Sequence, residues 1–397
     1  MISTVYIAKN VYGGDGLGRL GDGRVVFVPG AWEGENVRAE IVEERRNYVK
    51  ARLVEVVEPS PERIEGGLAS GVPGCVYAAL SCKGEYAAKH RQLVEFLERA
   101  RLDFGSVVSP SPDEAGLFNY RNKVVYHFGR RGDAWAIGYR REPGHEIVEI
   151  ENDPLAAPQI NAKLPEIRRS VLALLTTGPS SVRRDVERKG NLTVRWSEKT
   201  GVKWWVGDAP ENLVFRETTC GRTFEVPAGG FYQVNPSVGE KLVSAVCGEY
   251  AKISGEVGNL VDLYCGVGVF GLCCGPKRLF GVESGVKAVE FASRNAKDAG
   301  FTAKFAAGRV VSNLKKIRGD GEYAVVVDPP RGGMEPGVAK FLAGCGARKI
   351  FCVSCDPATM TRDLKELCKG YRIESVRWFN MCPRTARFET LVVLERR

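Results

Sequence analysis

The stretch Val353-Ser354-Cys355-Asp356-Pro357-Ala358-Thr359 decides the fold of the last third of the chain. The apolar residues 349–353 predict a buried strand, the Asp-Pro pair ends it, and a helical pattern follows directly. A cysteine at the C-terminal end of such a strand lies in the crevice where open α/β sheets have their active sites. A thiolate is a strong nucleophile, and the following helix N-terminus is expected to lower the pKa of the thiol. Cys355 is therefore a candidate nucleophile, and the alternative is a structural cysteine in the core.

Length, composition and charge limit the class of protein. The chain has 397 residues, 44% of them hydrophobic, which is enough for packed cores in about two or three domains. No apolar run reaches the roughly 18 residues that a membrane span needs, and residues 1–6 lack the features of a signal peptide. We therefore expect a cytoplasmic protein with no membrane partner. The formal net charge of +9 favours a nucleic acid partner, although it can also serve solubility alone.

The twelve cysteines are scattered along the chain, and no C-x-x-C pair repeats at zinc spacing. Neither a disulfide framework nor a structural metal site is expected from this pattern. Glutamine is scarce while Glu, Lys and Arg are common, a composition typical of thermophiles, in which intracellular disulfides become possible.

Residues 1–60 alternate in short β-like runs with glycine-rich turns between them, which predicts a small all-β barrel. The glycine cluster at 13–18 is not a dinucleotide fingerprint because no helix follows it, so we expect a turn with positive φ angles. The later strands carry basic residues and Tyr48, which suits the binding of single-stranded RNA. The alternative is a solvated charged face. A linker is expected around 58–61.

Residues 61–225 predict a second domain of mixed, β-rich structure. The segment 119–150 alternates and interleaves arginines with tyrosines and a tryptophan, which suits RNA backbone and splayed bases. A helical pattern runs through residues 90–97. Cys75 and Cys82 precede it, but two cysteines cannot hold an iron–sulfur cluster, which usually needs four ligands.

From about residue 226 onward, predicted strands alternate with predicted helices. This rhythm is typical of a doubly wound α/β domain. The helix candidates lie at 236–252, 285–299, 336–344 and 358–368.

Two glycines and an acid predict a nucleoside site in this domain. The strand 260–264 runs into a turn with Gly266 and Gly268, where the backbone can approach a bound nucleoside closely. The next strand, 278–283, ends in Glu283, whose carboxylate is placed to hold ribose hydroxyls. The turn lacks the third glycine of a dinucleotide loop. The pattern therefore favours S-adenosylmethionine, and a dinucleotide is the alternative.

Two further carboxyl groups are expected in the same crevice. Asp328 follows the strand 323–327, and Glu389 starts the last apolar strand. A lone glutamate on a buried strand is unfavourable unless it is paired or used. The alternative to a catalytic Glu389 is a salt bridge, for example to Arg384 or Arg387.

One reaction needs this set of groups. C5 of uracil is a poor nucleophile, but a thiolate added to C6 gives an enolate whose C5 can attack an electrophilic methyl group. A base must then remove the C5 proton so that the thiol can leave. Cys355, one carboxylate and a sulfonium cofactor would supply these parts.

The chain resembles the S-adenosylmethionine-dependent RNA uracil-C5 methyltransferase family, which makes 5-methyluridine in tRNA or rRNA. The first 60 residues resemble the TRAM RNA-binding barrel, and the family's motifs follow in the family's order. These motifs are the F-x-Q-x-N-P run at 231–236 and the stretches 262–268, 328–331, 354–359 and 383–389.

The resemblance implies a fold and a set of roles. The expected domains are an OB-like TRAM barrel at 1–60, a mixed central RNA-binding domain at 61–225, and a Rossmann-like class I methyltransferase domain at 226–397. Cys355 is expected to be the nucleophile and Glu389 the base. The residues expected to hold S-adenosylmethionine are Gln233, Tyr264, Gly266, Gly268, Glu283 and Asp328.

The chain departs from the family pattern at several other positions. Members of the family often bind a 4Fe–4S cluster, but here Glu85 stands where the third cysteine belongs and Asp153 where the later one would fall. We predict no cluster, and Cys75 and Cys82 are left either as a disulfide or as free thiols. The usual asparagine after the nucleophile is Asp356, the usual histidine two residues before the base is Arg387, and Asn380 replaces an aspartate.

Several alternatives stay open. The preferred target is the tRNA T-loop uridine 54, and a 23S rRNA uridine is the alternative. An RNA cytosine-C5 methyltransferase usually carries a cysteine in the Asp-Pro-Pro loop, which is absent at 328–331, and an amino-methyltransferase has an aromatic residue where Arg331 stands. A non-catalytic RNA-binding protein predicts a lost nucleophile or base. A monomer is expected.

Overall fold

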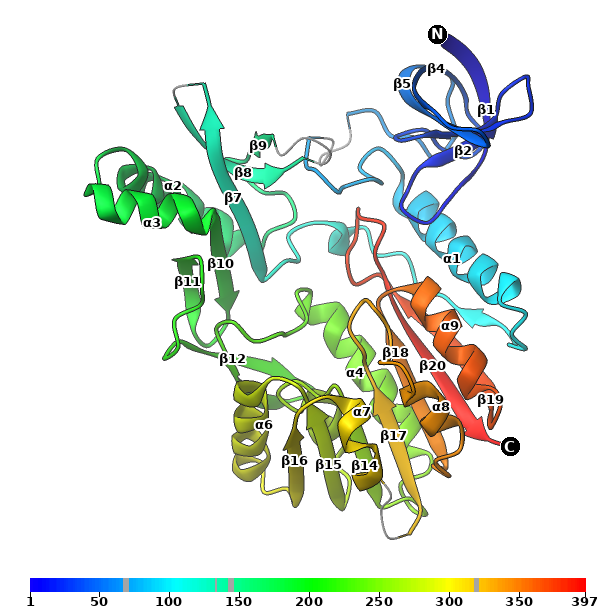
Figure 1. The fold of residues 1–397 in the computed structure, drawn as a ribbon, viewed down its shortest axis with the longest axis vertical. Helices are drawn as coiled ribbons and strands as arrows, with labels where there is room; N and C mark the ends of the chain where they lie inside the picture. Colours follow the sequence, from blue (N-terminus) through cyan, green and yellow to red (C-terminus); the bar gives the residue numbers. More distant parts are fainter. Residues whose placement is uncertain (67–70, 133, 142–145, 318–320) are drawn as a thin grey trace.

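The computed structural model describes residues 1–66, 71–132, 134–141, 146–317 and 321–397. It has an N-terminal barrel, a central sheet with two helices, and a large C-terminal sheet with helices on both faces (Figure 1). Within those ranges, no helix is both long and apolar enough to cross a membrane.

The N-terminal barrel is closed in the order β1-β2-β3-β5-β4. Its strands alternate between buried apolar and exposed residues, so the inward side chains, Val5 and Ile7 among them, fill the interior. Gly13 and Gly14 have φ angles of 110° and 98° in the turn after β1, and a strand follows them, as predicted. The strands are β1 (Ile2–Asn10), β2 (Gly16–Arg19), β3 (Val25–Val28), β4 (Asn36–Glu44) and β5 (Tyr48–Glu58).

The central region is an antiparallel sheet in the order β11-β10-β7-β8-β9. Apolar residues of α2 and α3 share a buried cluster with this sheet, in which Leu164 and Val171 of α2 lie together with Val124 and Tyr126 of β7. A separate hairpin, β12 and β13, leads to the C-terminal sheet. The elements are β7 (Lys123–Arg131), β8 (Ala134–Arg140), β9 (Ile147–Glu149), α2 (Pro158–Thr176), α3 (Ser180–Lys189), β10 (Asn191–Ser197), β11 (Gly201–Val206), β12 (Val214–Thr219) and β13 (Arg222–Pro227), with a short 3-10 helix at Ala115–Leu117.

The C-terminal sheet has the order β16-β15-β14-β17-β18-β20-β19-β6. β14 to β18 are parallel, and β20 enters antiparallel beside β18. The chain order reverses between β14 and β17, which is the point where open α/β sheets bind ligands. The strands are β6 (Val107–Val108), β14 (Asn259–Leu263), β15 (Arg278–Glu283), β16 (Ala303–Ala307), β17 (Tyr323–Val327), β18 (Lys349–Ser354), β19 (Tyr371–Phe379) and β20 (Glu389–Arg396).

Helices cover both faces of this sheet, and two apolar clusters fill the space beneath them. The four predicted helices are confirmed within two residues at each end. They are α4 (Pro236–Ala251), α6 (Val286–Asp298), α8 (Val338–Ala343) and α9 (Pro357–Leu367), and the shorter α5 (Val269–Cys274), α7 (Val310–Asn313) and a 3-10 turn at Leu314–Lys316 complete the set.

The segment before the central sheet packs on the C-terminal sheet. α1 (Cys82–Arg99) lies beside α9, and Leu93 and Leu97 are buried in the same cluster as Trp378 of β19 (Figure 1). The chain then adds β6 as a parallel edge strand next to β19. Helical periodicity predicts that α1 has an apolar face, but it does not say which sheet that face covers.

Candidate active site

Cys355 and Glu389 come from neighbouring antiparallel strands. Ser354 of β18 faces Thr390 of β20, and Cys355 directly follows this pair while Glu389 directly precedes it. Both side chains therefore lie at the same end of the ladder. Every residue of β18 is buried, as are the first six of β20, and two buried faces fix the register of a strand.

Three ionisable groups share this end of the sheet. Burial raises the pKa of Glu389 well above its ordinary value, and the charge of Asp328 raises it further. Burial also raises the pKa of Asp328 to about 7. The pKa of the Cys355 thiol rises to about 12, first through burial and then through Glu389 and Asp328. The charge of Arg331 lowers the pKa of both Cys355 and Glu389.

The predicted lowering of the Cys355 pKa by the helix N-terminus was wrong. Asp356 caps α9, and its Oδ1 accepts hydrogen bonds from the amides of Ala358 and Thr359 at 3.0 and 3.2 Å. These amides are already occupied by a carboxylate. Burial and the two neighbouring carboxyl groups therefore outweigh the helix, and the resting thiol keeps its proton.

A small cavity opens beside Asp328. Four of the six predicted cofactor-binding residues line it: Gln233, Tyr264, Gly266 and Asp328. Glu283 lines an adjoining cavity that shares Gly266 with the first. Gly268 lines neither cavity. It is the N-cap of α5 with a φ of 88°, and a side chain there would press on Leu272.

The turn after β14 has an unusual backbone that the second strand holds in place. Tyr264 has a φ of 63°, uncommon for a residue with a side chain, and Gly266 has a φ of 54°. The carboxylate of Glu283 accepts hydrogen bonds from the amides of Gly266 at 3.2 Å and Gly285 at 2.7 Å. The Tyr264 hydroxyl accepts one from the Glu335 amide at 3.1 Å.

The segment 231–235 joins this cavity to the loop before Glu389. Gln233 packs so closely on Gly239 of α4 that a Cβ on that glycine would lie 2.9 Å from the Gln233 Cβ. Asn235 caps α4 through the Val238 amide at 3.3 Å and donates to the Met381 carbonyl at 3.3 Å. Phe231, which is 69% exposed, borders both cavities.

The residues present fit S-adenosylmethionine. The backbone at Gly266 is open, with no atom within 4 Å of a Cβ placed there, and Glu283 stands at the tip of the second strand. Asp262 and Glu389 are buried and Asp328 is half-buried, and the pKa values of all three carboxyl groups are raised. A sulfonium cation beside Asp328 would offset their mutual repulsion.

The two arginines suggested as partners of Glu389 pair with other carboxylates. Arg384 pairs with Glu85, and Arg387 pairs with Asp356 at 3.2 Å. Asp356 and Arg387 are two of the positions at which the chain departs from the family pattern, and their contact was not predicted. Arg387 Nη1 also donates to the hydroxyl of Tyr12, a barrel residue, at 2.7 Å. No sequence signal marked Tyr12 as part of this site.

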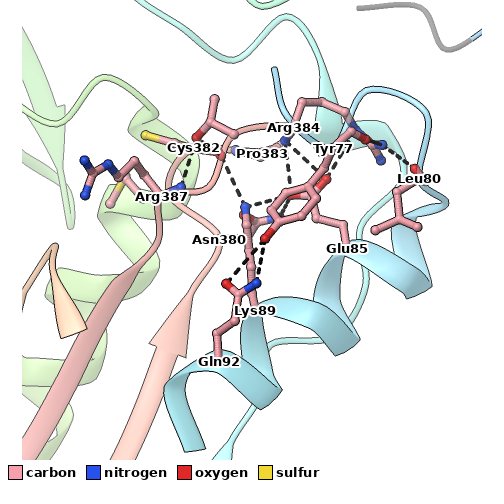
Figure 2. Close-up of polar contacts among 12 residues, drawn as sticks. Tyr77, Leu80, Glu85, Lys89, Gln92, Asn380, Cys382, Pro383, Arg384 and Arg387 are labelled. Carbon is pink, nitrogen blue, oxygen red and sulfur yellow. Dashed lines mark hydrogen bonds and ion pairs between the residues drawn. The ribbon is translucent and has the colours of Figure 1, made fainter. Parts of the chain in front are cut away.

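The residues at the family's cluster positions form a polar network instead. Glu85 is fully buried and accepts hydrogen bonds from Lys89 at 2.8 Å, Asn380 at 3.1 Å and the Arg384 amide at 3.1 Å (Figure 2). Asp153 accepts from the hydroxyls of Tyr126 and Tyr139 at 2.9 and 2.7 Å. Cys75 and Cys82 are free thiols.

This arrangement does not fit a 4Fe–4S cluster. Such a cluster needs four thiolates, whereas two of the four positions hold carboxylates already committed to other partners. Among the described residues, no group of three or more His, Cys, Asp or Glu is arranged to hold a metal. The absence of a cluster stays a prediction for chemical analysis of the protein.

Comparison with known proteins gives matches along the whole chain. A sequence model of the family described as tRNA (Uracil-5-)-methyltransferase matches residues 219–397, and a TRAM domain model matches residues 4–54. An uncharacterized RNA methyltransferase of Streptomyces avermitilis is 31% identical, covering 98% of this chain and 97% of the relative. One from Gloeobacter violaceus is 30% identical over 99% of this chain and 96% of the relative.

A solved structure is similar over the same span. The Pyrococcus abyssi tRNA (uracil-54, C5)-methyltransferase in complex with S-adenosyl-L-homocysteine is 22% identical and superimposes with a TM-score of 0.71. The match covers 98% of this chain and 100% of that one. The likeness confirms the predicted fold, in which an OB-like barrel and a central region precede a Rossmann-like methyltransferase domain.

Proposed function

Because this chain belongs to the tRNA (uracil-5-)-methyltransferase family, we propose that it methylates C5 of a uridine in structured RNA through a covalent bond between Cys355 and C6 of the base. The observation that carries this proposal is the position of Cys355 and Glu389 at one end of the β18–β20 ladder. Asp328 contributes to the pKa shifts of both and also lines the cofactor cavity.

The thiol must first lose its proton. A pKa of about 12 keeps Cys355 neutral at rest, so the proton has to pass to a neighbouring base as sulfur bonds to C6. Asp328 and Glu389 are the neighbouring carboxyl groups, and their raised pKa values make each a stronger base than an exposed carboxylate. Addition to C6 pushes the electron pair of the C5–C6 bond toward C5 and O4.

C5 of the base then accepts the methyl group, and Cys355 is released from C6. Bound S-adenosylmethionine would supply the electrophilic methyl group, and C5 would bond to it as the bond between the methyl carbon and the sulfonium sulfur breaks, with S-adenosylhomocysteine as the leaving group. Glu389 takes the proton from C5, and the electron pair of that C–H bond reforms the C5–C6 double bond. The bond between C6 and sulfur breaks, and Cys355 leaves as a thiolate. The thiolate then regains the proton that it gave to a neighbouring carboxylate, so the resting thiol is restored.

We assign the cofactor to the two adjoining cavities. Glu283 would hold the ribose hydroxyls, because its carboxylate keeps acceptor capacity beyond the amides of Gly266 and Gly285. Gly266 would let the backbone lie against the nucleoside, with Gln233 and Tyr264 along the same wall. Asp328 would face the charged end of the cofactor. Gly268 would act indirectly by allowing the turn into α5.

The proposed target is uridine 54 in the tRNA T-loop. Support comes from the fold shared with the Pyrococcus abyssi enzyme that acts there and from the TRAM barrel, a module suited to RNA. A 23S rRNA uridine is the second candidate. We further propose that the protein acts as a cytoplasmic monomer.

To test this function, the protein is incubated with methyl-labelled S-adenosylmethionine and, in separate reactions, with unmodified tRNA or rRNA transcripts. The labelled nucleosides are then identified by mass. We expect 5-methyluridine in the tRNA and none with Cys355→Ala. Label in rRNA alone would change the target. Label in 5-methylcytidine would change the base. Binding of RNA without any transfer would overturn the enzymatic role of Cys355.

A further inference from the structure

We propose that Tyr12, Asp356 and Arg387 form a clasp that holds the loop of Cys355, the loop of Glu389 and the barrel in one arrangement. The three are positioning residues, because they act through the groups next to them. This inference rests on the proposed function, since it assigns the reaction to Cys355 and Glu389.

The clasp is closed by three contacts. Arg387 Nη1 lies 3.2 Å from Asp356 Oδ2 and donates to the Tyr12 hydroxyl at 2.7 Å. The Tyr12 hydroxyl in turn donates to the same Asp356 oxygen at 3.3 Å. The guanidinium also stacks over the Tyr12 ring, 5.6 Å from its centre. Each member therefore touches the other two.

Asp356 ties the clasp to the nucleophile. It follows Cys355 directly, and its two carboxylate oxygens have separate tasks. Oδ1 caps α9, whereas Oδ2 faces Arg387 and Tyr12. A turn of this side chain would disturb either the cap or the clasp, so the backbone beside the thiol has one favoured position.

Arg387 and its neighbour tie the clasp to the base. Arg387 lies two residues before Glu389, and its amide donates to Thr385 Oγ1 at 3.2 Å. Figure 2 shows its side chain pointing away from the network around Glu85. Phe388, the residue between Arg387 and Glu389, is 1% exposed and packs edge-on against the Tyr12 ring at 6.1 Å.

Tyr12 brings the barrel into the site. It lies in the turn between β1 and β2, and its ring also packs edge-on against Phe96 of α1 at 5.6 Å. Burial and the charge of Asp356 raise the pKa of its hydroxyl to about 12, so it stays a neutral donor across the working pH range. A shift of the barrel on RNA would therefore reach both catalytic loops through one residue.

A second contact between the barrel and α1 provides a control, because it joins the two without reaching the catalytic loops. Lys9 of β1 pairs with Glu95 of α1 at 2.7 Å, with similar partial exposure of both side chains. This pair joins the barrel to the same helix but touches neither catalytic loop. Lys9→Gln is therefore the matched control for loss of a barrel contact alone.

A double-mutant cycle tests the clasp. The variants are Asp356→Asn, Arg387→Gln, their combination, Tyr12→Phe and Lys9→Gln, each measured for kcat, KM for RNA and thermal midpoint. We expect each single change at Asp356 or Arg387 to lower kcat by about tenfold, and the combination to fall no further than the worse single, a coupling of about tenfold. Tyr12→Phe should lower kcat by a few fold, and Lys9→Gln should leave kcat unchanged.

Three results would overturn the clasp. They are multiplying losses in the combined variant, losses confined to KM, or an equal loss of kcat in Lys9→Gln and Tyr12→Phe. The thermal midpoints identify any variant that fails to fold, and Tyr12→Phe keeps all the ring contacts, so it carries the test by itself if Asp356→Asn unfolds. Absence of transfer by the parent enzyme would instead overturn the proposed function.

Discussion

Asp328 raises the pKa of Glu389, although one carboxyl follows β17 and the other begins β20. The two strands are separated in the sheet by β18, which ends at Ser354, directly before Cys355. The crevice therefore holds two carboxyl groups that oppose each other's ionisation around one thiol. A cationic cofactor relieves this opposition, and a base of raised pKa suits removal of a carbon-bound proton.

The rate of methyl transfer should rise with pH. The pKa of Glu389 is raised, so at low pH the group is protonated and cannot accept the C5 proton, and the Cys355 thiol is harder to deprotonate. At saturating RNA and cofactor, we expect up to about tenfold more rate per pH unit below the controlling pKa, measured between about pH 5 and about pH 9. A rate that does not change with pH in this range would contradict the assignment of Glu389 as the base.

Asp328→Asn should stabilise the free protein while it impairs activity. The folded pKa of Asp328, about 7, lies above its ordinary 3.8, so ionisation on raising the pH destabilises the fold. The free energy of unfolding at about pH 8 should rise by about 1 to 3 kcal/mol in the variant, and the gain should vanish toward about pH 4. Urea denaturation at the two pH values measures it, and a loss of stability at high pH would contradict the electrostatic account.

Glu85→Gln should be strongly destabilising. Glu85 is the carboxylate that faces the buried Lys89 and Arg384, and its loss leaves both cations without a charged partner there. We expect a loss of about 3 kcal/mol in the free energy of unfolding. The control is Glu366→Gln, which breaks an exposed pair with Lys369 and should change stability by less than about 1 kcal/mol. Equal losses of unfolding free energy in the two variants would show that the hydrogen-bond network around Glu85 does not stabilise the fold.

Glu283→Gln should weaken binding of S-adenosylmethionine. The variant loses a charged acceptor at the ribose position and weakens two hydrogen bonds to the glycine turn. Calorimetry should show an increase in Kd of about tenfold or more. Glu290→Gln, on the exposed side of α6, is the control and should bind as the parent does. Unchanged affinity in Glu283→Gln would place the ribose elsewhere.

The positions of Cys355 and Glu389 at strand ends could be predicted from the apolar runs beside them, whereas their roles as nucleophile and base rest on the family resemblance and stay predictions. The positions of α4, α6, α8 and α9 followed from the 3.6-residue period of their apolar faces. The helix end beside Cys355 was also visible in the sequence. The direction in which the pKa of the Cys355 thiol shifts was not visible, because it depends first on the burial of the thiol and then on carboxyl groups that approach from other strands.

Contacts between distant segments could not be predicted. Tyr12 and Arg387 lie at opposite ends of the chain, and neither pattern nor composition indicates that they meet. Glu85 and Asp153 were recognised as replacements for cysteines, but their hydrogen-bond partners depend on how α1 and the central sheet pack. The same is true of α1 itself, whose apolar face was predictable and whose place beside β19 was not.

The most direct test of the central claim is trapping of the covalent adduct. Glu389→Gln is incubated with S-adenosylmethionine and the RNA substrate, and the mixture is analysed on a denaturing gel and by mass spectrometry. Because addition and methylation can occur but the C5 proton cannot leave, we predict a methylated RNA bound to Cys355. The combined Cys355→Ala and Glu389→Gln variant should give no adduct. An adduct that persists without Cys355, or transfer by the parent with no adduct in Glu389→Gln, would contradict the mechanism.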